Sequence, residues 1–368
     1  MHILSSTSKD IRLGRRGPQQ DYVLPRLLPG WYWLLIFDAD GSPLDPPALA
    51  LIWLPTGRIA DGTDIHLFLT NLHKNSPVYS CPLKMADPQD NHNYANPEEL
   101  ALLKAQTGIH NDDELKAHIS AVQKKAATVA NYPCIQRFGF IKIKINKFPS
   151  AYNHVLELAR KDPSALLLDI GCCFGNDLRK IALDGFPAQN MIASDLRQDF
   201  WNLGHDLFRS TPSTFPAAFL PGDALDDAFL ALHPLLDAPL STPAPDPHTL
   251  TSLTPLRARL SAIHSASVFH LFSEADQLRL ARKLAGLLVP RAGSMIWGCH
   301  GAQAEKGYVE GVPGRKMFCH SPESWRALWD GEVFPKGSVK VATHMVNAGR
   351  ILNERTDFWM MFWSVERL

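Results

Sequence analysis

The sequence predicts an α/β protein built on a doubly wound, mainly parallel sheet. From residue 151 onward, short apolar runs alternate with helical periods, an order typical of parallel strands joined by right-handed helical crossovers. The first apolar run, 166–170, passes directly into a turn bounded by Gly171 and Gly175. Two final apolar runs follow one another without a clear helix between them, which predicts a terminal antiparallel hairpin.

Each element of this region follows from its local pattern. We expect strands where a short apolar run is bounded by turn residues, and helices where apolar residues recur with the helical period. The expected helices are 151–160, 175–184, 198–208, 273–288 and 321–329, and the expected strands are 166–170, 190–195, 217–220, 260–267, 293–299, 338–346 and 357–365. Residues 232–258 are rich in Pro, Ser and Thr, which predicts a surface insertion.

The chain before residue 151 has a different pattern. Residues 1–30 are polar and basic with scattered Pro and Gly, and predict a flexible arm. Residues 31–150 predict an N-terminal extension or cap region. The first 90 residues of the chain are expected to cover an active site or to form a homodimer interface, and the sequence leaves both roles open. This extension has apolar runs at 31–37, 49–54 and 65–69 that predict strands, and helical patterns that begin near Asn96 and at Asp112. The sheet domain then covers residues 151–368.

The composition limits the classes of function. Among 368 residues, 37 Lys and Arg balance 37 Asp and Glu, which disfavours proteins that bind nucleic acid through a basic excess. No segment is long and apolar enough to span a membrane, and the first residues lack the apolar core of a secretory signal. Six cysteines without a Cys-x-x-Cys pair indicate reduced thiols. We expect a soluble, cytoplasmic protein that binds neither nucleic acid nor membrane.

The turn in LLLDIGCCFGNDLRK, residues 166–180, predicts a ligand site. Ligands of open α/β sheets bind beyond the carboxyl ends of the strands, and glycines let the backbone approach them closely. A dinucleotide turn has the spacing GxGxxG, but Cys173 and Asn176 stand at its second and third glycine positions. S-adenosylmethionine (SAM) has no pyrophosphate, so its turn tolerates a small residue there. We interpret Cys172 and Cys173 as small turn residues, not as nucleophiles or metal ligands.

Acidic residues recur at the ends of successive expected strands. Asp169 ends the first, and Asp195 ends the second, 24 residues after Gly171, where a carboxylate can accept hydrogen bonds from both ribose hydroxyls. Asp223, within Gly-Asp-Ala after the third strand, could meet the amino group of an adenine. Each could instead be an ordinary helix N-cap. Three in succession favour a nucleoside site.

With these motifs the sequence resembles class I SAM-dependent methyltransferases, which have a Rossmann-like sheet. The resemblance covers about residues 95–368. More narrowly, the turn GCCFG-x-DLRK, the FHLF after the fourth strand, CHSPESWRALW near the end and YPCIQRF at 132–138 are similar to one fungal family. That family includes the carboxyl methyltransferases of meroterpenoid biosynthesis. The resemblance implies an enzyme of fungal secondary metabolism that transfers a methyl group from SAM to a small-molecule acceptor, with a carboxylate as the expected acceptor group.

The resemblance also implies roles for individual residues. The residues expected to hold SAM are Asp169, Gly171, Cys172 and Gly175 around its methionine part, Asp195 and Leu196 at the ribose and adenine, Asp223 and Ala224 at the adenine, and Ser265 at the cofactor's edge. The YPCIQRF segment is expected to fold over the cofactor, with Tyr132 and Arg137 as candidates for binding its carboxylate. A structural role for Arg137 is the alternative.

His270, just beyond the fourth expected strand, is the candidate catalytic residue. A carboxylic acid is already ionised at neutral pH and needs orientation alone, so His270 would then bind the substrate or support the structure. A phenol or an amine must lose a proton, and His270 would then be the base. The sequence leaves these roles open.

The segment that follows the fifth expected strand, GCHGAQAEKGYVEGVPGRKMFCHSPESW, predicts a long glycine-rich loop over the cleft. The side chains expected to line an acceptor pocket there are Trp297, His300, Arg315, His320 and Trp325, while Trp329, Trp359 and Trp363 are expected to be buried packing. The two Cys-His pairs do not predict a metal site, because adjacent side chains of an extended segment point in opposite directions.

Two other functions stay open. A SAM-binding protein without transferase activity, acting as a regulator or partner subunit, would bind SAM without forming a methylated product. An NAD-linked oxidoreductase would bind NADH instead of SAM, and is the least favoured by the turn.

Overall fold

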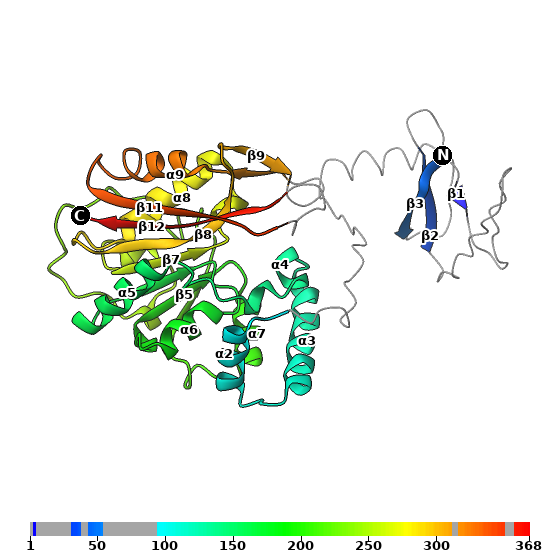
Figure 1. The fold of residues 1–368 in the computed structure, drawn as a ribbon, viewed down its shortest axis with the longest axis horizontal. Helices are drawn as coiled ribbons and strands as arrows, with labels where there is room; N and C mark the ends of the chain where they lie inside the picture. The colour runs from blue at the N-terminus through cyan, green and yellow to red at the C-terminus, as the bar shows by residue number, and fades with distance from the viewer. Residues whose placement is uncertain (1–2, 5–30, 38–42, 54–93, 311–315, 350–356) are drawn as a thin grey trace. The chain divides into compact units, whose positions relative to one another are not determined.

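The computed structural model describes residues 3–4, 31–37, 43–53, 94–310, 316–349 and 357–368. The chain divides into two compact units, Met1–Lys84 and Met85–Leu368. In the first unit, β1 (Ile3–Leu4), β2 (Trp31–Phe37) and β3 (Pro43–Trp53) form an antiparallel sheet (Figure 1). Strands therefore lie at the expected runs 31–37 and 49–54. The run 65–69 and most of the expected arm at 1–30 lie outside the described residues.

The second unit is built on a seven-stranded sheet in the order β11-β12-β8-β7-β4-β5-β6. Its parallel strands are β4 (Leu167–Ile170), β5 (Met191–Asp195), β6 (Ala218–Pro221), β7 (Ala262–Ala266) and β8 (Met295–Ala302). The antiparallel pair β11 (Val339–Asn347) and β12 (Trp359–Arg367) adds to the edge at β8. The expected α/β sheet with a terminal hairpin is confirmed.

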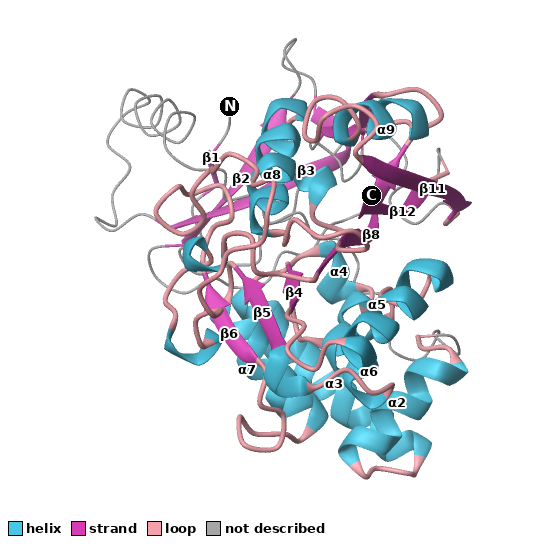
Figure 2. Cartoon of the chain, turned by 90° about the vertical axis from the view of Figure 1, so that its left-hand side faces the viewer, coloured by secondary structure: helices cyan, strands magenta, loops and turns pink. Residues whose placement is uncertain are grey.

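Helices cover both faces of this sheet, as Figures 1 and 2 show. On one face lie α2 (Pro97–Thr107), α3 (Asp112–Val129), α5 (Pro149–Lys161), α6 (Asn176–Leu183) and α7 (Gln198–Phe208), and on the other lie α8 (Glu274–Leu287) and α9 (Pro322–Trp329). Successive strand residues point to opposite faces, so Leu167 packs in the first core and Leu168 in the second. Short 3-10 turns connect these elements, and in the described part of the chain they lie at Gly139–Ile141, Ala188–Asn190, Pro247–Thr249, Thr254–Leu256 and Phe269–Leu271.

The segment before residue 151 contributes helices to the same unit as the sheet. The expected start of α2 is a capping box, in which Asn96 Oδ1 accepts from the Glu99 amide at 2.9 Å and Glu99 accepts from the Asn96 amide at 2.7 Å. The apolar face of α3, with Leu115, Ile119 and Val122, is buried, and α3 packs beside α7. The short helix α4 (Pro133–Gln136) follows.

The expected glycine-rich loop after residue 298 is largely a β structure. Strand β8 continues to Ala302, and β9 (Gly307–Glu310) and β10 (Lys316–Cys319) form an antiparallel hairpin. A Cβ on Gly298 would collide with the backbone of Ser265 in β7, and one on Gly301 would lie 2.7 Å from the ring of Phe358. These glycines therefore allow strands and rings to approach, and do not mark a loop.

The burial of three tryptophans can be compared with what the sequence predicts. Trp329 and Trp363 are buried as expected, but Trp359 is 36% exposed, because it begins β12 opposite Ala302, the last residue of β8.

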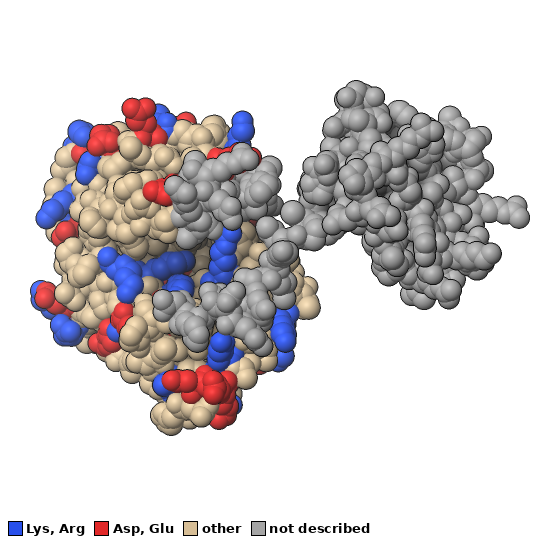
Figure 3. Space-filling model, turned by 45° about the vertical axis from the view of Figure 1, so that its right-hand side comes forward, with Lys and Arg blue, Asp and Glu red and all other residues tan. Residues whose placement is uncertain are grey.

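Within the described part of the chain, no helix is long and apolar enough to cross a membrane. Figure 3 shows acidic and basic side chains sharing one face, with several Lys and Arg side chains together near its middle.

Candidate functional site

The turn after β4 takes a conformation that favours glycine at three positions. Gly171 has φ 76°, Cys173 has φ 52° and Gly175 has φ 70°, after which α6 begins. The amides of Gly171 and Cys172 both donate to the Ser194 carbonyl, at 2.8 and 3.1 Å. The turn therefore lies against the end of β5.

Packing also requires the two glycines. A Cβ on Gly171 would collide with Val268 Cγ2, and a Cβ on Gly175 would lie 2.6 Å from the Trp201 ring. The expectation that the backbone needs close approach here is consistent with this geometry, although part of the approach is to the protein's own side chains.

A buried arginine, which the sequence analysis did not single out, supports the turn from below. Arg179 donates to the carbonyls of Phe174 at 3.1 Å and Gly175 at 3.3 Å, and its guanidinium lies 4.5 Å from the ring centroid of Phe208. Burial lowers the pKa of Arg179 to about 9. Its position in the DLRK motif, on the inner face of α6, was the available signal.

Asp195 links the turn to the end of β5. Its carboxylate accepts from the Cys173 amide and from the Arg197 amide, each at 2.9 Å, and burial raises its pKa. A carboxylate has about four lone-pair sites, so Asp195 keeps acceptor capacity for hydroxyl groups. The adjacent Leu196 is 62% exposed and leaves an apolar surface beside it.

Asp169, expected at the methionine part of a cofactor, is buried between β4 and β7, and that expected role stays a prediction. It is 2% exposed, and its Oδ1 accepts from His264 Nδ1 at 2.8 Å across the β4–β7 pair. Burial raises the pKa of Asp169. Asp169 is buried because β4 is covered on both faces, and it lies in register with His264 of the neighbouring strand.

The other expected cofactor residues occupy varied positions. Asp223 is exposed and accepts from the Leu225 amide at 2.8 Å, as a local cap would, with Ala224 half-buried beside it. Ser265 is fully buried, contrary to the expectation that it borders a cofactor, because β8 covers it at Gly298. Ser267, two residues further, is half-buried and stands beyond the end of β7.

The YPCIQRF segment lies against the connection from β5 to α7. Tyr132 precedes α4, is half-buried, and its ring centroid lies 6.0 Å from that of Phe200 at the start of α7. Arg137 is exposed, and its side chain makes no hydrogen bond or ion pair with the described residues. Tyr132 therefore lies beside the connection that follows Asp195, and the expected roles of Tyr132 and Arg137 stay predictions.

His270 has a defined protonation pattern. Its Nδ1 accepts from the Gly301 amide at 2.9 Å, and burial, with a smaller contribution from the charge of Lys144, lowers its pKa to about 4. The ring is therefore neutral at pH 7, and its one proton must be on Nε2. Among the described residues, Nε2 has no hydrogen-bond partner, and the His270 side chain is half-buried.

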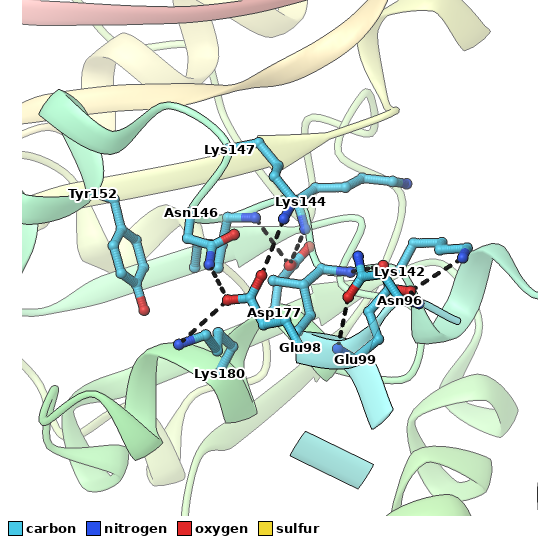
Figure 4. A network of polar contacts seen from close by, with 12 residues as sticks. Asn96, Glu98, Glu99, Lys142, Lys144, Asn146, Lys147, Tyr152, Asp177 and Lys180 are labelled. Atoms are coloured by element: carbon cyan, nitrogen blue, oxygen red, sulfur yellow. Dashed lines mark hydrogen bonds and ion pairs between the residues drawn. The ribbon is translucent and has the colours of Figure 1, made fainter. Parts of the chain in front are cut away.

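Lys144 is a cation of the site that the sequence analysis missed. Its Nζ donates to Ser267 Oγ at 3.1 Å, and its backbone amide donates to Asp177 Oδ1 at 2.7 Å. Figure 4 shows Lys144 within the polar network around Asp177, with its neighbours Lys142, Asn146 and Lys147. The alternating sequence IKIKIN was the signal, because it places lysines on the side opposite to buried isoleucines.

Four of the residues expected to line an acceptor pocket lie in the core. Trp297, His300, His320 and Trp325 are each at most 2% exposed. Trp297 Nε1 donates to the Ile145 carbonyl at 3.1 Å, and His300 Nδ1 accepts from Trp363 Nε1 at 2.9 Å. These side chains pack the sheet against its helices, contrary to the expectation of a pocket wall. Arg315, the fifth, lies outside the described residues.

The two cysteines of the turn have the properties expected of small packing residues. Burial raises the pKa of Cys172 and of Cys173 well above the ordinary value for a thiol. Both thiols are therefore protonated at neutral pH and are weak nucleophiles.

The chemical groups at this end of the sheet fit SAM. Asp195 offers acceptors for a ribose, Leu196 an apolar surface for a base, and Lys144 an ammonium with no carboxylate partner among the described residues. The tight turn at Gly171 brings backbone to the same place. The arrangement therefore offers a complement to each end of the cofactor.

Comparison with known proteins places the chain among methyltransferases. Residues 88–141, which contain α2, α3 and α4, match a family described as the meroterpenoid methyltransferase N-terminal domain. The chain is 29% identical over 220 residues to methyltransferase adrK of Penicillium rubens, covering 59% of this chain and 70% of that protein. It is 30% identical over 234 residues to methyltransferase ausD of Penicillium brasilianum, covering 62% and 74%. It is 30% identical over 252 residues to O-methyltransferase atr3 of Stereocaulon alpinum, covering 68% and 64%.

Proposed function

Since the chain belongs to the fungal family of SAM-dependent methyltransferases that includes the meroterpenoid enzymes, we propose that it methylates a carboxylate of a small-molecule acceptor. The enzyme class and the cofactor follow from the family, so an NAD-linked oxidoreductase and a silent SAM-binding protein are no longer the favoured alternatives. The proposal concerns the acceptor group and the residues that hold it.

The protonation state of His270 carries this proposal. A base must offer an unprotonated nitrogen to the acceptor, but Nδ1, the unprotonated nitrogen of His270, already accepts the Gly301 amide. Nε2–H can donate a hydrogen bond instead. An acceptor that needs no deprotonation and that accepts a hydrogen bond fits this arrangement, and a carboxylate does both.

When bound, SAM would supply an electrophilic methyl group, so that a C–O bond to the acceptor would form while the C–S bond broke with its electron pair left on sulfur. The carboxylate and the sulfonium lose their opposite charges, and the products are a methyl ester and S-adenosylhomocysteine. The contribution of the chain is to hold both partners in line and to exclude water. Asp195 and Leu196 would hold the nucleoside, and His270 would orient an oxygen of the acceptor.

A product assay tests the acceptor group directly. Purified protein is incubated with SAM carrying a labelled methyl group and a panel of carboxylic acids, each paired with a matching phenol and amine. Mild alkali releases labelled methanol from a methyl ester, and leaves aryl ethers and N-methyl groups intact. We expect alkali-labile label with at least one acid. Label that resists alkali, found with the phenols or the amines alone, would overturn the proposal.

Two substitutions of His270 separate a hydrogen-bond donor from a base. His270→Gln keeps an N–H near the place of Nε2, and His270→Asn keeps an acceptor near the place of Nδ1. We expect Gln to retain most of kcat/KM and Asn to lose about tenfold, mainly in KM, which is the value of one hydrogen bond. The rate should not change from pH 6 to 8. A base would make both variants lose about 10²- to 10⁴-fold. The exposed His248 gives the control, His248→Gln.

A further inference from the structure

We propose that Lys144 binds a carboxylate of a ligand in this active site. SAM carries such a group on its methionine part, and the proposed acceptor carries another. Lys144 would pair with either carboxylate in the same way. Only the second alternative, in which Lys144 binds the carboxylate of the acceptor, rests on the proposed function.

The sequence around Lys144 contains its own comparison. In IKIKI, residues 141–145, the isoleucines are each at most 2% exposed, whereas Lys142 and Lys144 are half-buried. Lys142 Nζ pairs with the buried carboxylate of Glu99 at 3.1 Å. Lys144 Nζ has the Ser267 hydroxyl as its partner and no carboxylate among the described residues. Two lysines of similar burial therefore differ in having an acidic partner.

The position of Lys144 is fixed by buried groups. Asp177, which is 6% exposed, accepts from the amides of Lys144 at 2.7 Å and Ile145 at 3.0 Å through one oxygen. The flanking isoleucines belong to the core beside α3 and α5. Because the backbone is held on both sides, the ammonium is presented at a defined place, which is what an anchor for a ligand requires.

That place is the mouth of the site. Ser267, the partner of Lys144, follows β7 with φ 61°, and its amide donates to the Cys299 carbonyl of β8 at 2.6 Å. The charge of Lys144 also acts on Cys173 in the glycine turn and on His270. Through Ser267 the ammonium lies just beyond the end of β7, three residues before His270, and the end of β7 pairs with the end of β4, from which the glycine turn starts.

A half-buried ammonium that has no carboxylate partner among the described residues would be stabilised by an anion from a ligand. Partial burial removes water from the ammonium, and a neutral hydroxyl compensates less than a carboxylate does. A bound carboxylate would form a charge-assisted hydrogen bond with Lys144, and such bonds contribute about 1.5 to 3 kcal/mol. Its loss would weaken binding about 10- to 100-fold.

The test is equilibrium binding by calorimetry to the full chain, without an acceptor. S-adenosylhomocysteine is compared with its decarboxylated analogue, which lacks the carboxylate and keeps the amine. If Lys144 binds the carboxylate of the cofactor, Lys144→Met weakens the binding of S-adenosylhomocysteine about 10- to 100-fold and leaves the binding of the analogue unchanged. Lys144→Gln, which keeps a hydrogen bond to Ser267 without the charge, should behave in the same way and serves if the Met variant does not fold.

Two controls accompany the binding test. Lys142→Met removes a lysine that already has its own carboxylate, and should leave both ligands unchanged. Arg137→Met removes the rival anchor, which is exposed on the turn after α4. Selective loss of S-adenosylhomocysteine binding in Arg137→Met, with none in the Lys144 variants, would assign the cofactor carboxylate to Arg137.

The acceptor arm uses the acid that the ester assay identifies. If Lys144 binds the carboxylate of the acceptor, Lys144→Met leaves the affinity for S-adenosylhomocysteine unchanged and raises the KM of that acid about 10- to 100-fold. Unchanged values in both arms would overturn the proposal, as would equal loss of S-adenosylhomocysteine and its analogue. If no acid is methylated, the proposed acceptor group fails, and the cofactor arm by itself decides the role of Lys144.

Discussion

At the scale of single residues, the same side chain has different roles at neighbouring strand ends. Asp195 stands at the last position of β5 and accepts two amides of the surrounding loops, whereas Asp169 stands one position before the end of β4 and pairs with His264 in the core. The sequence showed an acid at each place. Both side chains lie on the same face of the sheet, because Asp169 is in register with Ala193, two residues before Asp195. Asp195 is therefore one strand period nearer to the loops, whose amides it accepts, whereas Asp169 lies beside His264 of β7.

The role of Asp195 gives a prediction for cofactor binding. Asp195→Ala removes the acceptor proposed for the ribose, the bond to the Cys173 amide of the turn and the bond to the Arg197 amide, so we expect the affinity for S-adenosylhomocysteine to fall about 10- to 100-fold in calorimetry. Asp199→Ala, four residues away on the exposed first turn of α7, should leave it unchanged. An unchanged affinity in Asp195→Ala would remove Asp195 from the site.

At the scale of elements, the turn between β4 and α6 combines backbone strain with tight packing. Gly171 and Gly108 have almost the same backbone conformation, with φ 76° and 69°. A Cβ on Gly171 would collide with Val268, and a Cβ on Gly108 would meet nothing within 4 Å. Comparing Gly171 with Gly108 therefore separates the free-energy cost of the left-handed backbone conformation from the free-energy cost of the steric collision.

Alanine substitutions of these two glycines should differ in size. Gly108→Ala should lower the free energy of unfolding by about 1 to 2 kcal/mol, the cost of a left-handed residue. Gly171→Ala adds overpacking of about 1 to 3 kcal/mol and should also weaken S-adenosylhomocysteine binding. Urea unfolding and calorimetry measure the two effects. Equal destabilisation with unchanged binding in both variants would contradict the structural role given to the turn.

Elements were predictable from the sequence where local pattern and packing agree, as in α7 and the face of α3. Elements were not predictable where one residue type serves two different structural purposes. Gly298 and Gly301 have the composition of a loop, but they lie in β8, where neighbouring groups leave no room for a Cβ. A glycine signal does not say whether the backbone must bend or a neighbour must come close.

At the scale of the whole molecule, neutral histidines make stability depend on pH. Burial lowers the pKa values of His270 and His320 to about 4, against 6.5 for a free side chain. Between these values the unfolded chain binds more protons than the folded one. Stability therefore rises from pH 4 to 6.5 and receives no further contribution from these groups at higher pH.

We expect the free energy of unfolding to fall as the pH is lowered from 6.5 to 4, by about 3 kcal/mol for each of these two histidines. His320→Gln should make this dependence shallower, because one of the two groups no longer titrates. His248→Gln, at an exposed position, should keep the slope of the natural chain. Urea unfolding at several pH values measures the slopes, and identical slopes in all three proteins would contradict the prediction.

The sequence by itself determined the α/β order, the glycine turn, the terminal hairpin and the family, because these depend on local periodicity and on short motifs. The tertiary structure decided which side chains of those motifs are accessible. It placed Asp169, Ser265 and four expected pocket residues in the core, and it brought Lys144 beside Ser267, 123 positions further along the chain. Such contacts join segments that are far apart in sequence, and strand order and register fix them, so no local pattern could predict them.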